Sequence, residues 1–246
     1  MKPYKQVVAE RYDGYERHIH LYQNQYALLN PIGFTADRAI RKAFYKAFNH
    51  IRSQGVDLTT CHLLDIGCGK GYATRLFSEF TGNPKQITGI DLSETRVREA
   101  QILNPAINYL KGDLVELPTL PQPSDIITVM DVFMHLATEE EINQAFHNIH
   151  NQLINKGFFI WYDAYAKDHF TSAANADHRG FNITQAIQLA HKAGFTLTYK
   201  STLFKTFFNR YHSLYFSRYL PNWVISLLEA LVPGKPGNFL LVFQKQ

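Results

Sequence analysis

Short apolar runs alternate with amphipathic helical stretches from Cys61 to the end of the chain. The runs are rich in Ile, Leu, Val and Phe and are bounded by Gly, Pro, Asn or Asp, which is typical of buried strands. We predict strands at residues 61–66, 86–91, 107–112, 125–131, 157–163, 196–204 and 239–245. Because most of these strands alternate with helices, the pattern predicts a doubly wound α/β sheet with seven strands, most of them parallel.

Helices are predicted where apolar residues recur three and four positions apart. Residues 138–153 begin with Thr138 and Glu141 in a capping-box pattern, and Gly157 is suited to a left-handed stop after this helix. The helix in residues 183–195 is expected to stop in the same way at Gly194. Earlier in the chain, after the glycine-rich stretch, a helix is predicted whose buried face consists of Ala73, Leu76, Phe77 and Phe80.

Two segments lie outside this alternation. Residues 1–58 are helical in pattern and rich in Tyr, and we expect them to form an N-terminal helical cap on a main domain of residues 59–246. Residues 206–237 form an insertion before the last strand. Its apolar stretch is too short to span a bilayer, which leaves open a lid over a pocket, a dimer contact or contact with a membrane surface.

Composition and charge narrow the class of protein. With 246 residues, 46% of them hydrophobic, the chain can bury a full core, and a formal charge of +4 is too small to call for nucleic acid. The two cysteines, Cys61 and Cys68, lack metal or redox spacing, so no metal site is predicted and a reducing, cytoplasmic compartment is expected. Neither a secretory signal nor a membrane-spanning apolar run is recognised in the sequence.

The most informative stretch is LLDIGCGKGYATRLF, residues 63–77, where glycines separate an apolar run from a helical one. A dinucleotide fingerprint requires a third glycine at the position that Tyr72 occupies, and the phosphate-loop pattern is also absent. Asp65 precedes the turn and would repel a pyrophosphate, whereas it would attract an ammonium or a sulfonium. The turn therefore favours a cationic nucleoside over a phosphate ligand.

Over residues 60–165 the sequence resembles the class I S-adenosylmethionine-dependent methyltransferases. LLDIGCGKG matches the first motif of that family, Asp91 ends the second strand, Asp113 follows the third, and DIITVMDVFMHL matches the fourth-strand segment. The resemblance implies a seven-stranded Rossmann-like sheet whose last strand is inserted antiparallel, with S-adenosyl-L-methionine as the cofactor. An acid in the position of Asp91 can accept hydrogen bonds from both ribose hydroxyls, and the family reads the adenine near Asp113. The cofactor-binding residues expected are Asp65, Gly67, Cys68, Gly69, Asp91, Leu92, Asp113, Leu114 and Met130.

Methyl transfer from a sulfonium requires mainly alignment, but a hydroxyl acceptor benefits from a base. His135 is the candidate catalytic residue because it follows the fourth strand, although a histidine here also fits a role in supporting the loop. Weaker candidates for the acceptor side or for cofactor contact are Asp163, His178, Tyr12, Tyr15 and Arg38.

MDVF after the fourth strand lacks the Asn/Asp-Pro-Pro-aromatic segment of enzymes that methylate exocyclic amines of nucleic-acid bases or glutamine amides. We therefore expect a methyltransferase that acts on an O or N atom of a small molecule, with a sugar- or glycan-related acceptor preferred. Nucleic acid is a disfavoured partner, and a homodimer is compatible with the sequence. The alternatives left open are an RNA methyltransferase, an NAD(P)-dependent oxidoreductase and a non-catalytic S-adenosylmethionine-binding module.

Overall fold

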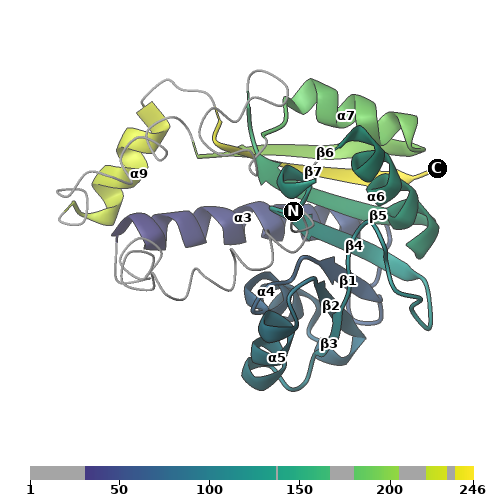
Figure 1. The fold of residues 1–246 in the computed structure, drawn as a ribbon. Coiled ribbons are helices and arrows are strands. Elements are labelled where there is room, and N and C mark those ends of the chain that lie inside the picture. Colours follow the sequence, from purple (N-terminus) through teal and green to yellow (C-terminus); the bar gives the residue numbers. More distant parts are fainter. Residues whose placement is uncertain (1–30, 137, 167–179, 205–219, 232–235) are drawn as a thin grey trace, which may run out of the picture.

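The computed structural model describes residues 31–136, 138–166, 180–204, 220–231 and 236–246. Its centre is a seven-stranded sheet in the order β3-β2-β1-β4-β5-β7-β6 (Figure 1). The first five strands along this order pair in parallel, while β7 pairs antiparallel with both β5 and β6. The strands are β1 (Leu63–Ile66), β2 (Ile87–Asp91), β3 (Asn108–Lys111), β4 (Ser124–Met130), β5 (Leu153–Ala164), β6 (Phe195–Leu203) and β7 (Asn238–Lys245). The predicted mostly parallel sheet, with its last strand inserted antiparallel, is confirmed.

Helices cover both faces of the sheet. One apolar cluster joins α3, α4 and α5 to one face, and a second joins α6 and α7 to the other face. The helices described are α3 (Pro31–Ser53), α4 (Tyr72–Thr81), α5 (Glu94–Leu103), α6 (Glu139–Gln152), α7 (Ile183–Lys192) and α9 (Asn222–Leu231), with short 3₁₀ turns η2 (Pro84–Gln86) and η3 (Phe133–His135).

Strand β5 shows why the sheet must be covered on both sides. Successive side chains of a strand point to opposite faces, and Phe158 and Ile160 belong to the α3 cluster while Phe159 and Trp161 belong to the α6 cluster. All four are at most 1% exposed. An unbroken apolar run is what a strand buried between two helical layers requires.

The two predicted helix stops have different outcomes. Gly194 follows Ala193, the C-cap of α7, and has φ 86, as expected for a left-handed stop. The stop at Gly157 is wrong, because β5 begins at Leu153 and the left-handed residue is Lys156, with φ 63. Gly157 instead permits a close backbone approach, since a Cβ there would lie 3.0 Å from the carbonyl oxygen of Ile154.

The start of α6 agrees with its sequence signal. Thr138 is the N-cap, and its hydroxyl accepts a hydrogen bond of 3.2 Å from the backbone N–H of Glu141. Three acidic residues in the first turn add a favourable interaction with the positive end of the helix dipole.

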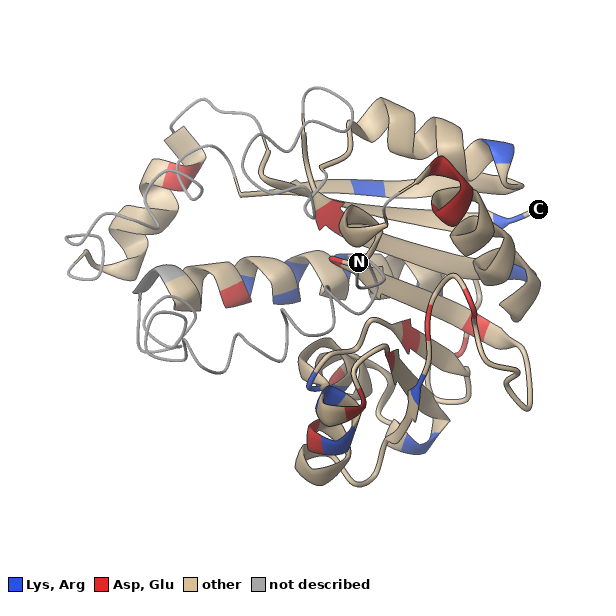
Figure 2. Cartoon of the chain, viewed as in Figure 1, with Lys and Arg blue, Asp and Glu red and all other residues tan. Residues whose placement is uncertain are grey.

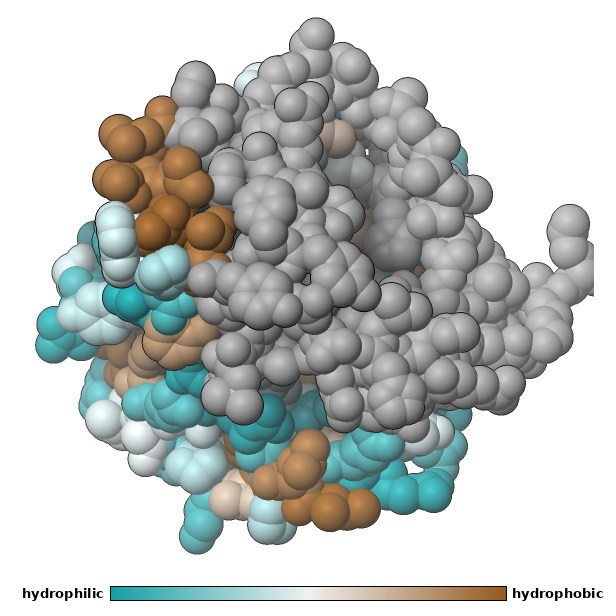
Figure 3. Space-filling model, turned by 90° about the vertical axis from the view of Figure 1, so that its left-hand side faces the viewer, coloured by the Kyte–Doolittle hydropathy of each residue, from teal (hydrophilic) through white to brown (hydrophobic). Residues whose placement is uncertain are grey.

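The additions to the domain are described in part. Of the predicted N-terminal cap, the structure describes the 23-residue helix α3, which packs against α4, β6, β7 and α9; residues 1–30 lie outside the described part. Of the insertion, α9 is described, and its Ile225 is buried against Ala36, Phe204 and Leu220. At the end of the molecule that α9 occupies, apolar side chains are exposed (Figure 3), among them Trp223, Leu227 and Leu231. Among the described helices, none is long and apolar enough to cross a membrane.

Candidate active site

The glycine-rich turn joins β1 to α4 in a left-handed backbone conformation. Gly67, Gly69 and Gly71 have φ values of 78, 54 and 79, a region that residues with a Cβ enter only at a cost. The backbone N–H groups of Gly67 and Cys68 both donate to the carbonyl oxygen of Ile90, at 2.7 and 3.0 Å. These bonds fix the turn to the neighbouring strand β2.

Two of these glycines also provide space for neighbouring side chains. A Cβ on Gly67 would lie 2.1 Å from Cγ2 of Val132, which follows β4, and one on Gly71 would lie 2.5 Å from the hydroxyl of Tyr109 on β3. A Cβ on Gly69, in contrast, would approach only an end nitrogen of the Arg96 side chain, at 3.2 Å. The turn is therefore packed against the protein at Gly67 and Gly71 and is least constrained at Gly69.

Asp91, at the end of β2, holds the turn through its carboxylate. One oxygen accepts a hydrogen bond of 2.8 Å from the backbone N–H of Gly69, and the other accepts one of 2.9 Å from the N–H of Ser93. Each carboxylate oxygen can accept a second hydrogen bond, and Asp91 is partly exposed. The arrangement allows Asp91 to fix the turn and to receive hydroxyl groups of a ligand at the same time.

Asp65 lies beneath the turn, with 1% of its surface exposed. Its two oxygens accept hydrogen bonds from the hydroxyls of Thr74 on α4, at 2.6 Å, and Thr128 on β4, at 2.8 Å. Burial raises the pKa of Asp65 to about 6, an effect that the two hydroxyls oppose. The carboxylate thus joins β1, α4 and β4 from inside, and its charge would act on a ligand above the turn through the field rather than by an exposed contact.

The remaining cofactor candidates stand at the same edge of the sheet. Asp113, after β3, accepts a hydrogen bond of 2.9 Å from the backbone N–H of Val115, and Leu114 is buried. Parallel pairing aligns the ends of β1, β2 and β4, because Ile66 is opposite Ile90 and Val129. Figure 2 shows acidic residues at the carboxyl ends of several strands. The structure thereby brings to one edge all nine of the predicted cofactor residues: Asp65, Gly67, Cys68, Gly69, Asp91, Leu92, Asp113, Leu114 and Met130.

A pair of carboxyl groups lies next to this edge, where β4 and β5 end. Asp163 is fully buried; one of its oxygens accepts hydrogen bonds from Trp161 Nε1 and the backbone N–H of Met134, both at 3.2 Å, and the other accepts one from the N–H of Ala164. Asp131 is partly exposed and has a left-handed φ of 55. Burial raises the pKa of Asp131 to about 7, and burial with the neighbouring charge of Asp131 raises that of Asp163 well above its usual range. Both shifts favour retention of a proton on this pair above the pH at which an exposed carboxyl group ionises.

Sequence reasoning singled out Asp163 but not Asp131. A signal was present, since Asp131 directly follows β4 and Asp163 is the second-last residue of β5, and the parallel register places Met130 opposite Tyr162. His135, the first candidate for a base, ends η3 and is partly exposed on the same loop. The structure thus adds Asp131 as a second titratable group on the loop that carries His135.

Of the other candidates, three lie outside the described part and one is exposed on α3. Tyr12, Tyr15 and His178 fall outside the described residues. Arg38 is exposed on α3, with its guanidinium 5.7 Å from the ring centroid of Phe34.

A contact that sequence reasoning missed joins α3 to the turn, because the Tyr72 hydroxyl donates to the carboxylate of Asp37. Arg41 adds hydrogen-bonded ion pairs to Asp37, at 2.9 Å, and to Glu79 of α4, at 3.0 Å. These contacts fix α3 to α4.

Comparisons with known proteins agree with this geometry. Residues 63–157, which contain β1 to β4 and the start of β5, match the family model described as a methyltransferase domain. An uncharacterized methyltransferase of Oceanobacillus iheyensis is 32% identical over 123 residues, which are 49% of this chain and 56% of that protein. Another, from Geobacillus kaustophilus, is 28% identical over 74% of this chain and 72% of its own length. The matched region therefore spans little more than half of the first relative.

Among solved structures, the magnesium protoporphyrin IX methyltransferase of Synechocystis with bound S-adenosylhomocysteine is similar over 98% of this chain and 100% of its own, with a TM-score of 0.65 and 14% identity. At this identity the likeness concerns the fold. This likeness in fold extends beyond residues 63–157 on both sides.

Proposed function

We propose that this chain, which belongs to the class I S-adenosylmethionine-dependent methyltransferases, transfers a methyl group from that cofactor to an O or N atom of a small molecule. The observation that carries the proposal is the turn after β1, in which the Asp91 carboxylate binds the N–H of Gly69 beside the carboxyl ends of β4 and β5. The methyltransferase domain match favours this reading over an NAD(P)-dependent oxidoreductase.

The residues at the edge fit the cofactor. Asp91 is partly exposed and can accept ribose hydroxyls, while Asp113 stands at the end of the next strand for the adenine. Gly69 is the turn glycine whose missing Cβ meets only a flexible side-chain end, so a ligand can approach the backbone there. We propose apolar contact with the nucleoside for Leu92, Leu114 and Met130.

The bound cofactor supplies an electrophilic methyl group on a sulfonium. The protein's part is alignment and, for a hydroxyl or ammonium acceptor, removal of a proton. Asp131 fits the second role because it is partly exposed and its pKa is raised above the usual range of a carboxyl, while the buried Asp163 accepts the hydrogen bond of the Met134 N–H and so positions the loop. His135 stays the alternative base on the same loop.

Calorimetric titration with S-adenosylhomocysteine tests the cofactor site. Wild-type protein should bind it, and Asp91→Ala should weaken binding at least tenfold, since hydrogen bonds to a charged group contribute about 1.5–3 kcal/mol each. Asp57→Ala removes an exposed acid before β1 and should bind like wild type. Absence of binding by folded wild-type protein, or equal affinity of Asp91→Ala and wild type, would refute the proposal.

A small acceptor is supported by the Synechocystis methyltransferase, whose name specifies a porphyrin and whose fold matches nearly all of this chain. A panel of small molecules and a structured RNA, assayed for formation of S-adenosylhomocysteine, separates the two classes. Product formation with RNA alone would overturn the small-molecule assignment. The sugar-related acceptor, the cytoplasmic location and the homodimer stay predictions from the sequence.

A further inference from the structure

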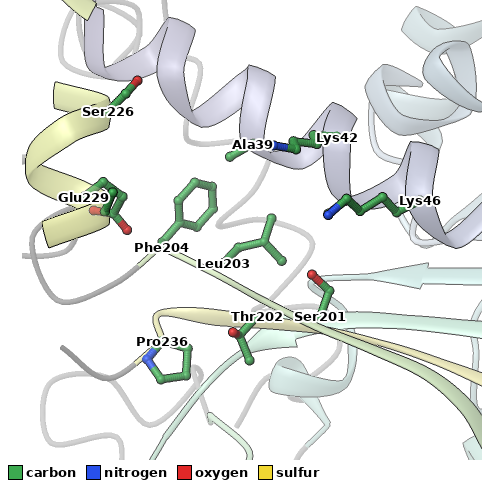
Figure 4. A pocket seen from close by; sticks show the side chains of 12 residues that line it. Ala39, Lys42, Lys46, Ser201, Thr202, Leu203, Phe204, Ser226, Glu229 and Pro236 are labelled. Atoms are coloured by element: carbon green, nitrogen blue, oxygen red, sulfur yellow. The ribbon is translucent and has the colours of Figure 1, made fainter. Parts of the chain in front are cut away.

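A cavity of about 410 Å³ lies between α3, the end of β6 and α9 (Figure 4). This volume is within the range of small-molecule sites, which begin at roughly 300 Å³. Its wall combines charged, hydroxyl-bearing and apolar side chains. The cavity is formed by Ala39, Lys42, Ala43, Lys46, Ser201, Thr202, Leu203, Phe204, Ser226, Glu229, Ala230 and Pro236.

Two lysines and two hydroxyl groups form its polar part. Lys42 and Lys46 are one helical turn apart on α3, and Ser201 and Thr202 come from β6 on the facing wall. Figure 4 shows the Lys46 amine and the Ser201 hydroxyl pointing toward one another. Within the described part of the chain, neither lysine makes an ion pair or a hydrogen bond. Like charges at this spacing repel, and an anion between them would remove the repulsion.

The apolar part is formed by the end of β6. Leu203 is buried, and Phe204 has a left-handed φ of 51 at the residue where the strand ends. Phe204 contacts the main core on one side and Ile225 of α9 on the other. Glu229 lines the wall that α9 contributes, and its negative charge disfavours an anion there. Charge thus directs an anionic group to the lysines and leaves the apolar wall for the rest of a ligand.

The position of the cavity connects it with the active site. Because β5 and β6 are both antiparallel to β7, the carboxyl end of β6 lies at the same edge of the sheet as those of β4 and β5. Three strand intervals separate β4 from β6, which at about 4.8 Å each is about 14 Å. An extended small molecule can span this distance.

We propose that the cavity binds the anionic end of an amphiphilic acceptor, with a carboxylate or phosphate against Lys42 and Lys46 and an apolar part against Leu203 and Phe204. Only the identification of this ligand as the acceptor rests on the proposed methyltransferase function. The preference of the cavity for an amphiphilic anion rests on its own side chains.

The test compares octanoate, octyl phosphate and octanol by calorimetric titration at concentrations where they are monomeric. Wild-type protein should bind at least one of the anions ten or more times more tightly than octanol, because only an anion engages the lysines. The tighter of the two anions identifies the head group. Equal affinity for octanol and both anions would overturn the proposal.

Variants locate the binding to the cavity. Lys42→Gln with Lys46→Gln should reduce anion affinity at least tenfold, to the level of octanol. Lys192→Gln with Lys200→Gln makes the same change of charge at exposed lysines outside the cavity and should leave affinity unchanged. Unchanged affinity in the first pair, or an equal loss in both pairs, would refute the assignment.

The same proteins are then titrated with S-adenosylhomocysteine. Both pairs of variants should bind it like wild type, which shows that they are folded. If wild type fails to bind S-adenosylhomocysteine yet prefers the octyl anions, the methyltransferase proposal fails while the anion site stands. If the cofactor binds and the anions do not, the anion site alone is refuted.

Discussion

Substitution of Gly67 by Ala should destabilise the protein through two separate effects. The residue has φ 78, and a Cβ there would lie 2.1 Å from Cγ2 of Val132, a distance at which one of the two groups must move. A left-handed residue with a Cβ costs about 1–2 kcal/mol. Forcing an extra carbon into a packed site costs typically 1–3 kcal/mol more. We expect Gly67→Ala to lower the free energy of unfolding by about 2–5 kcal/mol.

Urea unfolding of a set of variants separates the two contributions. Gly82→Ala is the matched control, because Gly82 has φ 67 and nothing within 4 Å of an added Cβ, so its loss should be the conformational part alone. Val132→Ala removes Cγ2, and the double variant Gly67→Ala with Val132→Ala should recover about 1–3 kcal/mol relative to the sum of the single changes. The reasoning is refuted if Gly67→Ala costs no more than Gly82→Ala, or if the double-mutant cycle shows no coupling.

Three further predictions concern polar groups in and around the turn. A carboxyl whose pKa is raised by folding stabilises the fold below its unfolded pKa, and this contribution is lost as pH rises through the folded value. The free energy of unfolding of wild type should therefore fall between about pH 4 and pH 7 because of Asp65 and Asp131, and urea unfolding of Asp131→Asn across this range should show a shallower fall; an unchanged slope would contradict the assignment to Asp131. Thr128→Val removes one hydroxyl donor from Asp65 and should lower the free energy of unfolding at pH 8 by about 1–3 kcal/mol, whereas a loss below about 0.5 kcal/mol would show that the bond is unimportant. Tyr72→Phe removes the donor to Asp37 and should speed amide exchange in α3 while the urea midpoint changes little; unchanged exchange would argue against this contact as a clamp.

The sheet was predictable because a strand that is buried on both faces needs a continuous run of apolar residues. All seven predicted strands are present within a few residues, since apolar runs bounded by turn residues are the direct consequence of covering both faces. The start of β5 was not predictable in this way. α6 ends at Gln152 and β5 begins at Leu153 with no turn between them, and Gly157 has the sequence signature of a helix stop while it allows a close backbone contact.

The candidate site was predictable only where its residues belong to one segment. The glycine turn and Asp91 follow from local sequence and spacing. The hydroxyls of Thr74 and Thr128 that hold Asp65 come from different elements, and no local pattern marks them. The Asp131 and Asp163 pair likewise depends on which two strands lie side by side. Residues that meet through the tertiary fold leave a signal in sequence only when the strand order is also known.

The packing of Val132 into the space left by Gly67 has a consequence for how the two halves of the site respond to change. Val132 follows Asp131 directly, and the backbone of Met134, two residues farther, donates to the buried Asp163. The cofactor turn and the acceptor-side loop are therefore in direct contact, and a shift of the loop moves Val132 against the turn. Because closely packed interiors transmit strain, substitutions at Asp163 should reach the cofactor turn although Asp163 lies outside the predicted cofactor set. We therefore expect a change in the protonation of Asp131 and Asp163 to alter the geometry of the turn.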